Sequence, residues 1–364
     1  MENIINIPES FSDFLDELRS LPGEINHSEL FCKPSRTIAT NENLAKFLED
    51  LHQYNSLISV DCETDSLDPY TTTLVGISIT DLRSKTSLYL PVNHSETEIQ
   101  KNFSILECLT FFNTVFNLLD AGNPVIYFNQ EFDQIVMAIQ ALKEGLGTSY
   151  VRPKSSVDVM HLVDLMQFQG FPSLKDLAVQ YRVTEYKDVV SFSRMLSNIF
   201  GIEEDTIKSA LAKPDINPEI IKAIDMKNTT AAEVYEYACD DTIHTLYVFL
   251  LMFDQYVGIL ENNSNRTDLS GLVIASRNLI LQGVTQLFFT FANLNGILVR
   301  PSMVDVVIDE VNEEMGELNS NFTRSIRKVM GWPLEGPPPK VRRGRKPKDQ
   351  EISTPSLFDT EVKL

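Results

Sequence analysis

Two segments of the chain place acidic residues where their side chains would share one face. Asp61 and Glu63 end a short β-prone run, and side chains two apart on a strand point to the same side. Asp133 lies four residues after Asn129, so both would lie on one side of a helix's first turn if Asn129 caps that helix. Each pattern alone also fits ordinary structure, namely an acidic turn and a helix N-cap with an acid that compensates the dipole.

A third segment adds a phenol and another carboxylate. Tyr237 and Asp241 are four residues apart, so on a helix their side chains emerge side by side. Asp240 would point about a quarter turn away, and we expect it to be an ordinary surface acid. Taken alone, the segment also fits an amphipathic helix with two surface acids.

If the three segments meet, four carboxylates gather: Asp61, Glu63, Asp133 and Asp241. Four like charges are costly to bring together unless divalent cations neutralise them. Ligand sets made only of oxygen favour Mg²⁺ or Mn²⁺ over zinc. Two such ions about 4 Å apart activate a water and stabilise the leaving oxygen of a phosphodiester. The pattern therefore predicts phosphodiester hydrolysis with two ions, in which Tyr237 orients the attacking water.

The composition narrows the class of protein. The 364 residues are 43% hydrophobic and can bury a core, but 31 Lys and Arg face 51 Asp and Glu, giving a formal net charge of -20. This balance excludes a protein that holds DNA by bulk positive charge. The four cysteines form no CxxC pair, so we expect neither a disulfide framework nor a thiolate zinc site. With no signal peptide or membrane-length apolar run apparent, we expect a cytoplasmic protein, at the nucleoid or a viral replication site.

Hydrophobic periodicity predicts the elements that would position these residues. Three β-rich runs in quick succession suggest an antiparallel meander, and the chain then alternates between helices and short strands. Strands followed by such alternation predict an α/β domain with a mixed sheet. A long periodic helix, 233–253, carries the third segment. The expected strands are 37–40, 57–60, 74–80, 87–92, 125–128 and a short segment near Val157.

The two ends of the chain differ in composition from this α/β region, which we place at 36–260. Residues 1–35 form an acidic N-terminal extension. Long apolar helices are expected within 266–332, joined by an Asn-Gly turn. Residues 333–364 contain three consecutive prolines and a basic stretch, so they are expected to form a flexible tail or linker. The basic stretch, 342–348, is either a DNA-contacting arm or a solvated linker.

Four stretches of the chain match motifs of one enzyme family, the family A (DNA polymerase I-like) DNA polymerases. The first exonuclease motif of that family resembles ISVDCETDSLDPYTTTLVGISIT with SLYLPV, and the second resembles FNQEFDQIVM. The third resembles YEYACDDTIHTL, in the subclass with a tyrosine. The helices that open the polymerase region resemble LFFTFANLNGILVRPSMVDVVIDEVNEEMGELNSNF. Together the motifs resemble the DnaQ-like 3′–5′ proofreading exonuclease domain and the start of the polymerase.

The resemblance implies a fold and roles for the acids. The fold would be a ribonuclease H-like mixed sheet flanked by helices, followed by long helices of an incomplete polymerase domain. Asp61, Glu63 and Asp241 would hold one Mg²⁺ or Mn²⁺ ion. Asp61 would also hold a second ion, with Asp133 acting through water. Tyr237 matches the family's catalytic tyrosine.

The resemblance also implies a reaction and partners. A single-stranded or frayed 3′ end of DNA would lose its terminal nucleotide as a deoxynucleoside 5′-monophosphate. Thr64, Leu67 and Asn129 match positions that contact this nucleotide. The polymerase active-site motifs are absent from this sequence, so a separate or missing polymerase portion would be a partner. Residues 356–358 faintly resemble a sliding-clamp-binding peptide.

Two other functions stay open from the sequence. An exoribonuclease related to ribonuclease D uses the same four acids and the tyrosine, although the polymerase-like helices argue against it. A non-catalytic scaffold for replication proteins would be indicated by the loss of an acid, but all four acids are present.

Overall fold

The computed structural model describes residues 34–263, except 55, 99, 120–122, 167–169, 171 and 214–216, together with residues 282, 283, 285, 286 and 290. The chain divides into one unit of residues 1–297 and a second of residues 298–364. The predicted extension, polymerase-like helices and tail fall almost entirely outside the described residues, so their boundaries stay predictions.

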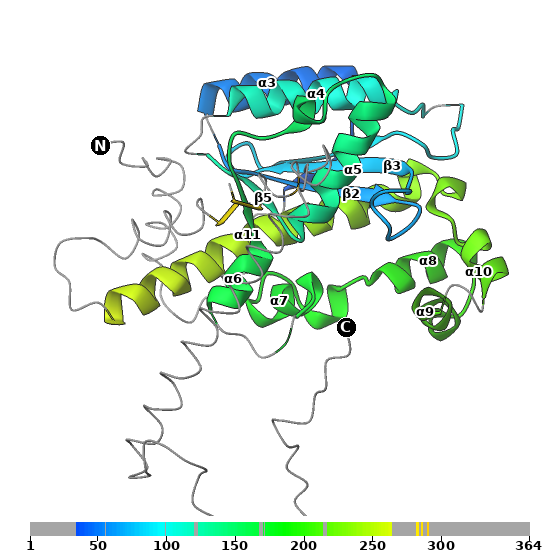
Figure 1. Ribbon diagram of the computed structural model, residues 1–364. Coiled ribbons are helices and arrows are strands. Elements are labelled where there is room, and N and C mark those ends of the chain that lie inside the picture. The colour runs from blue at the N-terminus through cyan, green and yellow to red at the C-terminus, as the bar shows by residue number, and fades with distance from the viewer. Residues whose placement is uncertain are drawn as a thin grey trace, which may run out of the picture. The chain divides into compact units, whose positions relative to one another are not determined.

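A six-stranded mixed sheet forms the centre of the described region (Figure 1). Its strands are β1 (Ser35–Ile38), β2 (Ile58–Thr64), β3 (Leu74–Asp81), β4 (Thr86–Pro91), β5 (Val125–Tyr127) and β6 (Ser156–Asp158). The order across the sheet is β1-β4-β3-β2-β5-β6. Strand β3 runs antiparallel to β2 and β4, whereas β2, β5 and β6 are mutually parallel. An antiparallel meander followed by parallel strands confirms the predicted α/β class and is the arrangement of a ribonuclease H-like fold.

Helices cover both faces of this sheet. Figure 1 shows α3 and α4 on one side and α11, α6 and α7 on the other. The α-helices are α3 (Asn41–Tyr54), α4 (Ile105–Leu118), α5 (Gln130–Lys143), α6 (Val159–Leu165), α7 (Leu174–Gln180), α8 (Phe192–Phe200), α9 (Glu204–Ala212), α10 (Pro218–Ala223) and α11 (Ala231–Asn263). Short 3₁₀ helices are η1 (Thr148–Val151), η2 (Tyr186–Asp188) and η3 (Met226–Asn228).

The side chains of strand β2 alternate between an apolar face and a polar face. Its residues Ile58, Val60 and Cys62 are buried in the core that also contains side chains of α3, α4 and α5. Ser59 points the other way, because its hydroxyl donates to the Thr242 carbonyl on α11 at 2.7 Å. Residues 61 and 63 share the parity of Ser59 and therefore face α11. The predicted apolar run 57–60 had these two acids at its end, and the pairing of β2 with β3 continues through both of them.

Helix α11 packs its apolar residues against the face of the sheet on which Ser59, Asp61 and Glu63 lie. Leu246, Leu250 and Val257 are fully buried there with side chains of α6 and α7. By length and composition, its residues Ala231–Ile259 are long and apolar enough to cross a membrane, and 78% of the apolar window is buried inside the protein. The expectation that the chain holds no apolar run of membrane length was therefore wrong for α11, whose apolarity serves the core.

Candidate active site

Three carboxylates come together where β2 faces α11. Asp61, Glu63 and Asp241 can each contribute one oxygen so that all three oxygens lie within 4.8 Å of one another. Strand alternation places the first two on one face of β2, and α11 brings the third over them. Glu63 is 7% exposed and Asp241 9%. The fold thus gathers acids from two distant parts of the chain into one group.

The electrostatics of this cluster favour a bound cation. Burial raises the pKa of Asp61 and of Glu63 well above their usual values, and the charge of Asp61 raises that of Glu63 further. Among the described residues, Oε1 of Glu63 is buried and has no hydrogen-bond partner. A divalent ion would satisfy this oxygen and offset the like charges. The oxygen-only donor set fits Mg²⁺ or Mn²⁺ rather than Zn²⁺.

Asp133 lies beside the cluster but is held by a different contact. It is 2% exposed on the first turn of α5, and its Oδ1 accepts a hydrogen bond from the backbone N–H of Cys62 at 2.9 Å. Burial and then the charge of Asp61 raise its pKa, although the Cys62 bond acts against this. The structure therefore gathers three of the four predicted acids into one cluster and ties the fourth to the backbone between Asp61 and Glu63.

Tyr237 lies one turn before Asp241 on α11. Burial, followed by the charges of Glu63 and Asp61, raises the pKa of its phenol well above the ordinary value. The hydroxyl therefore stays protonated at neutral pH and can donate a hydrogen bond near the carboxylates. Its ring packs against Phe192 of α8, with ring centroids 6.1 Å apart.

Lys175, near the start of α7, is a site residue that the sequence analysis missed. Its Nζ forms an ion pair with Oδ1 of Asp241 and lies 4.7 Å from the centre of the Tyr237 ring. Burial lowers its pKa to about 8, although the surrounding carboxylates act in the opposite direction. The lysine stands in the stretch SLKDLA, and no spacing in the sequence connects it to α11.

Asp240, the neighbour of Asp241 on α11, stands outside the cluster. Its Oδ1 forms an ion pair with Nη2 of Arg36 on β1, and its side chain is 26% exposed. The expectation of an ordinary acid outside the catalytic set agrees with this position. The contact joins α11 to the edge strand of the sheet.

The residues expected to contact a terminal nucleotide lie at the ends of two parallel strands. Thr64 ends β2 and donates a hydrogen bond to the Ser66 carbonyl at 2.8 Å, and Leu67, just beyond it, is 84% exposed. Asn129 follows β5, which is parallel to β2. Because β2 and β5 are parallel neighbours, their C-terminal ends lie at the same edge of the sheet. All three residues therefore follow or end strands at the edge where the carboxylate cluster is located. Their contact with a nucleotide stays a prediction.

Asn129 does not cap α5 in the way that its spacing suggested. It has the left-handed backbone conformation (φ 68°), and its side chain makes no capping hydrogen bond to the described residues. Asp158 takes this part instead, accepting the backbone N–H groups of Asn129 at 3.0 Å and Gln130 at 2.9 Å. The Asn129 side chain is thereby left exposed at the sheet edge.

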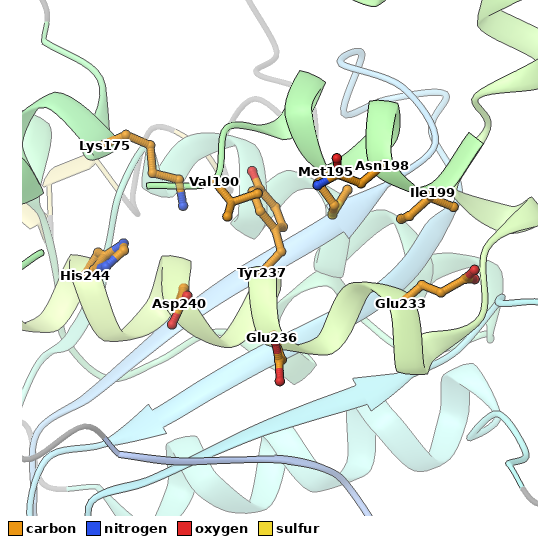
Figure 2. A pocket seen from close by; sticks show the side chains of 10 residues that line it. All are labelled: Lys175, Val190, Met195, Asn198, Ile199, Glu233, Glu236, Tyr237, Asp240 and His244. Carbon is orange, nitrogen blue, oxygen red and sulfur yellow. The ribbon is translucent and has the colours of Figure 1, made fainter. Parts of the chain in front are cut away.

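A cavity of about 220 Å³ adjoins the cluster, between α11 and the segment that contains α7 and α8 (Figure 2). Figure 2 shows Lys175 reaching toward α11 between His244 and Tyr237. The lining residues are Lys175, Val190, Met195, Asn198, Ile199, Glu233, Glu236, Tyr237, Asp240 and His244. The lining is therefore mostly apolar on the α8 side, with Asn198 as a polar exception, and mostly charged on α11.

Comparison with known families places this site inside a recognised domain. Residues 35–255 match a family model described as 3′–5′ exonuclease. The DNA polymerase I of Borreliella burgdorferi is 27% identical over 166 residues, which are 45% of this chain and 17% of that protein. The chain thus matches less than a fifth of the length of this curated relative. The matched family range includes every residue of the cluster.

Solved structures of low sequence identity also align with the chain. A structure described as the apo form of a nuclease covers 72% of this chain and 95% of its own, with 13% identity and a TM-score of 0.39. The EXO domain of Aedes aegypti Nibbler covers 66% and 92%, with 13% identity and a TM-score of 0.36. Brucella melitensis NrnC with bound Mg²⁺ covers 59% and 91%, with 15% identity and a TM-score of 0.24.

Proposed function

The chain belongs to the 3′–5′ exonuclease family, and from that premise we propose that it is the proofreading portion of a family A DNA polymerase. The reaction would be hydrolysis of the 3′-terminal phosphodiester of DNA, releasing deoxynucleoside 5′-monophosphates. The observation that carries the proposal is the meeting of Asp61, Glu63 and Asp241 within 4.8 Å. The link to a polymerase is supported by the 27% identity to DNA polymerase I of Borreliella burgdorferi.

The proposed cofactor is a pair of divalent ions, Mg²⁺ or Mn²⁺. Asp61, Glu63 and Asp241 would hold one ion, and Asp61 with Asp133 acting through water would hold the other. Oε1 of Glu63, which has no hydrogen-bond partner in the part of the chain that the structure describes, supports metal binding at this place. When bound, two such ions activate a water and stabilise the leaving oxygen of a phosphodiester.

The remaining side chains would position the substrate and the water. Tyr237, kept protonated by its raised pKa, would donate its hydroxyl to the attacking water. Thr64 and Asn129 would contact the terminal nucleotide from the ends of β2 and β5. Leu67, in the connection that follows β2, has an exposed apolar side chain that is suited to contact with a base.

Selectivity for mismatched ends would come mostly from fraying, because an unpaired end is cheaper to place as a single strand in the site. The net charge of -20 gives the chain little bulk attraction to duplex DNA. We therefore propose that duplex affinity comes from the polymerase portion, joined or separate. A sliding clamp is a weaker proposed partner, and the cytoplasm is the proposed compartment.

A comparison of labelled substrates tests this function. The protein is incubated with 5′-labelled single-stranded DNA, 3′-mismatched duplex DNA and RNA of the same sequence, with Mg²⁺ or with a chelator. We expect shortening from the 3′ end one nucleotide at a time, faster on single-stranded and mismatched DNA than on matched duplex, and none with the chelator. Asp61→Asn should lose most of its activity, about 10²- to 10³-fold, whereas Asp205→Asn, at an 89% exposed side chain on α9, should retain activity.

The same experiment separates the alternatives. Faster shortening of RNA than of DNA would favour the exoribonuclease. Intact DNA and RNA, with a folded protein in Mg²⁺, would favour the non-catalytic scaffold. Release of dinucleotides or longer products from DNA would contradict the proposed single-nucleotide reaction.

A further inference from the structure

Lys175 shares a carboxylate with the candidate metal site. Its Nζ forms an ion pair with Oδ1 of Asp241, and Asp241 is one of the three residues whose oxygens converge within 4.8 Å. Only 17% of the lysine side chain and 12% of the Asp241 side chain are exposed. The contact is therefore a largely desolvated one, in which a charge without its partner is costly. An ion that takes Oδ1 of Asp241 as a ligand competes with the ammonium group for that oxygen, and an ion on the other oxygen of the carboxylate meets the repulsion of the nearby ammonium charge.

The surroundings of Lys175 hold its ammonium group in place and also provide a second position for it. The group lies 4.7 Å from the centre of the Tyr237 ring, within the range of a cation–π contact. On its other side is the cavity of about 220 Å³, whose lining includes Asp240 and His244 (Figure 2). A small rotation of a four-carbon side chain would carry the ammonium group from Asp241 into this cavity. It would stay near Asp240 there, so the move would not leave it without a negative neighbour.

We propose that Lys175 is a positioning residue that serves as the built-in counter-ion of the metal-free carboxylate cluster. Its ammonium group holds Asp241 beside Asp61 and Glu63 in the absence of metal, and it releases Asp241 when a divalent ion binds. The inference deepens the proposed function and rests on it. Three like charges held within 4.8 Å repel one another, and Lys175 is the cation that contacts one of them in the described residues. The lysine therefore stabilises the metal-free fold and competes with the metal.

The test uses the full chain and compares Lys175→Met with Lys175→Arg and Lys208→Met. Methionine keeps the apolar stem without the charge, and arginine keeps the charge. Lys208 pairs with Glu204 on α9, away from the cluster, so its variant measures the loss of an ordinary surface ion pair. The thermal unfolding midpoint is measured in a chelator and with Mn²⁺, and the affinity for Mn²⁺ alone is measured by titration calorimetry.

We expect Lys175→Met to lower the midpoint in chelator more than Lys208→Met does, and to recover most of that loss in Mn²⁺. Its affinity for Mn²⁺ should rise about tenfold, the effect of removing one neighbouring charge. Lys175→Arg should stay close to the unsubstituted chain in both measurements. An unchanged or weaker Mn²⁺ affinity in Lys175→Met, or a chelator midpoint equal to that of Lys208→Met, would overturn the proposal.

A second variant covers the case in which Lys175→Met does not fold. The double variant Lys175→Met with Asp241→Asn removes the negative charge that the lysine neutralises, and it should fold in chelator; if it also fails to fold, the counter-ion role is wrong. Failure of the proposed function looks different, because the unsubstituted chain would then neither bind Mn²⁺ nor shorten DNA. Metal-dependent activity in the unsubstituted chain with no change in the Lys175 variants would remove only this inference.

Discussion

Asp158 and Glu63 are both buried carboxylates at strand ends, yet the fold surrounds them in opposite ways. Asp158 accepts the backbone N–H groups of Asn129, Gln130 and Met160 at 2.9 to 3.0 Å and joins the beginnings of two helices. Glu63 keeps one buried oxygen without a partner in the described region and has Asp61 as a like-charged neighbour. Hydrogen bonds from backbone amides stabilise a carboxylate, whereas burial beside a like charge destabilises it. The partners of a buried acid, more than its burial, distinguish a structural residue from a site residue.

The largest expected effect is a loss of activity on substitution of Asp61, the like-charged neighbour of Glu63. Asp61→Asn should lower the rate of shortening of labelled single-stranded DNA in Mg²⁺ by about 10²- to 10³-fold, the range for losing one preorganised electrostatic group. The unfolding midpoint in chelator should not fall, because the substitution removes a charge that repels Glu63. Turnover near that of the unsubstituted chain would show that Asp61 is not part of the active site.

Asp158→Ala should have the opposite pattern, with a large loss of stability and a small change in activity. Loss of this carboxylate leaves three backbone N–H groups without their acceptor, two of them at the start of α5 and one in α6. The free energy of unfolding in urea should fall by about 3 kcal/mol. The activity per folded molecule should change much less than in Asp61→Asn, and a stability loss below about 1 kcal/mol would contradict the structural role.

His94 is another buried polar residue with hydrogen-bond partners, and it predicts how the stability of the fold depends on pH. His94 Nε2 lies 2.6 Å from the Tyr89 hydroxyl and its Nδ1 3.1 Å from the Thr229 carbonyl, so Nδ1 donates and Nε2 accepts. Burial lowers the pKa of His94 from 6.5 to about 4. Because the folded chain holds the neutral ring, this stability is present above about pH 6.5 and is lost as the pH falls toward about 4.

The expected loss over that range is on the order of 2 to 3 kcal/mol. It is measured as the difference in pH dependence of urea unfolding between the unsubstituted chain and His94→Gln, which cannot titrate there. Because other acids titrate in both proteins, only the difference reports on His94. Parallel pH profiles for the two proteins would show that the ring does not resist protonation.

The last prediction concerns Glu63 itself and the dependence of stability on pH. Its folded-state pKa is raised above the unfolded value, so stability is complete at low pH and is lost as the pH rises toward the folded value. Glu63→Gln should therefore increase the free energy of unfolding in chelator at pH 8 and change it little at pH 4. In Mg²⁺ the order should reverse, because the unsubstituted chain gains more from the ion. A stability loss at pH 8 in chelator would mean that Glu63 is satisfied after all.

Local pattern predicted much of the fold and part of the site. The succession of β-rich runs predicted the meander, and the later alternation of strands and helices predicted the parallel addition of β5 and β6. Asp61 and Glu63 were predicted to end a strand and to share one face, and the pairing of β2 with β3 through both residues confirms this. Asn129 stands at the predicted N-cap position of α5, but its side chain makes no capping hydrogen bond to the described residues, and the distant Asp158 accepts the backbone N–H groups of Asn129 and Gln130 instead.

The sequence by itself determined which residues have the chemistry for a metal site and which faces of strand and helix they occupy, because those faces follow from local periodicity. Only the tertiary structure decided which of them meet. It joined Asp61 and Glu63 to Asp241, tied Asp133 to the Cys62 amide and placed Lys175 against Asp241. Contacts between distant segments depend on how whole elements pack, and side-chain spacing along the chain does not encode that packing.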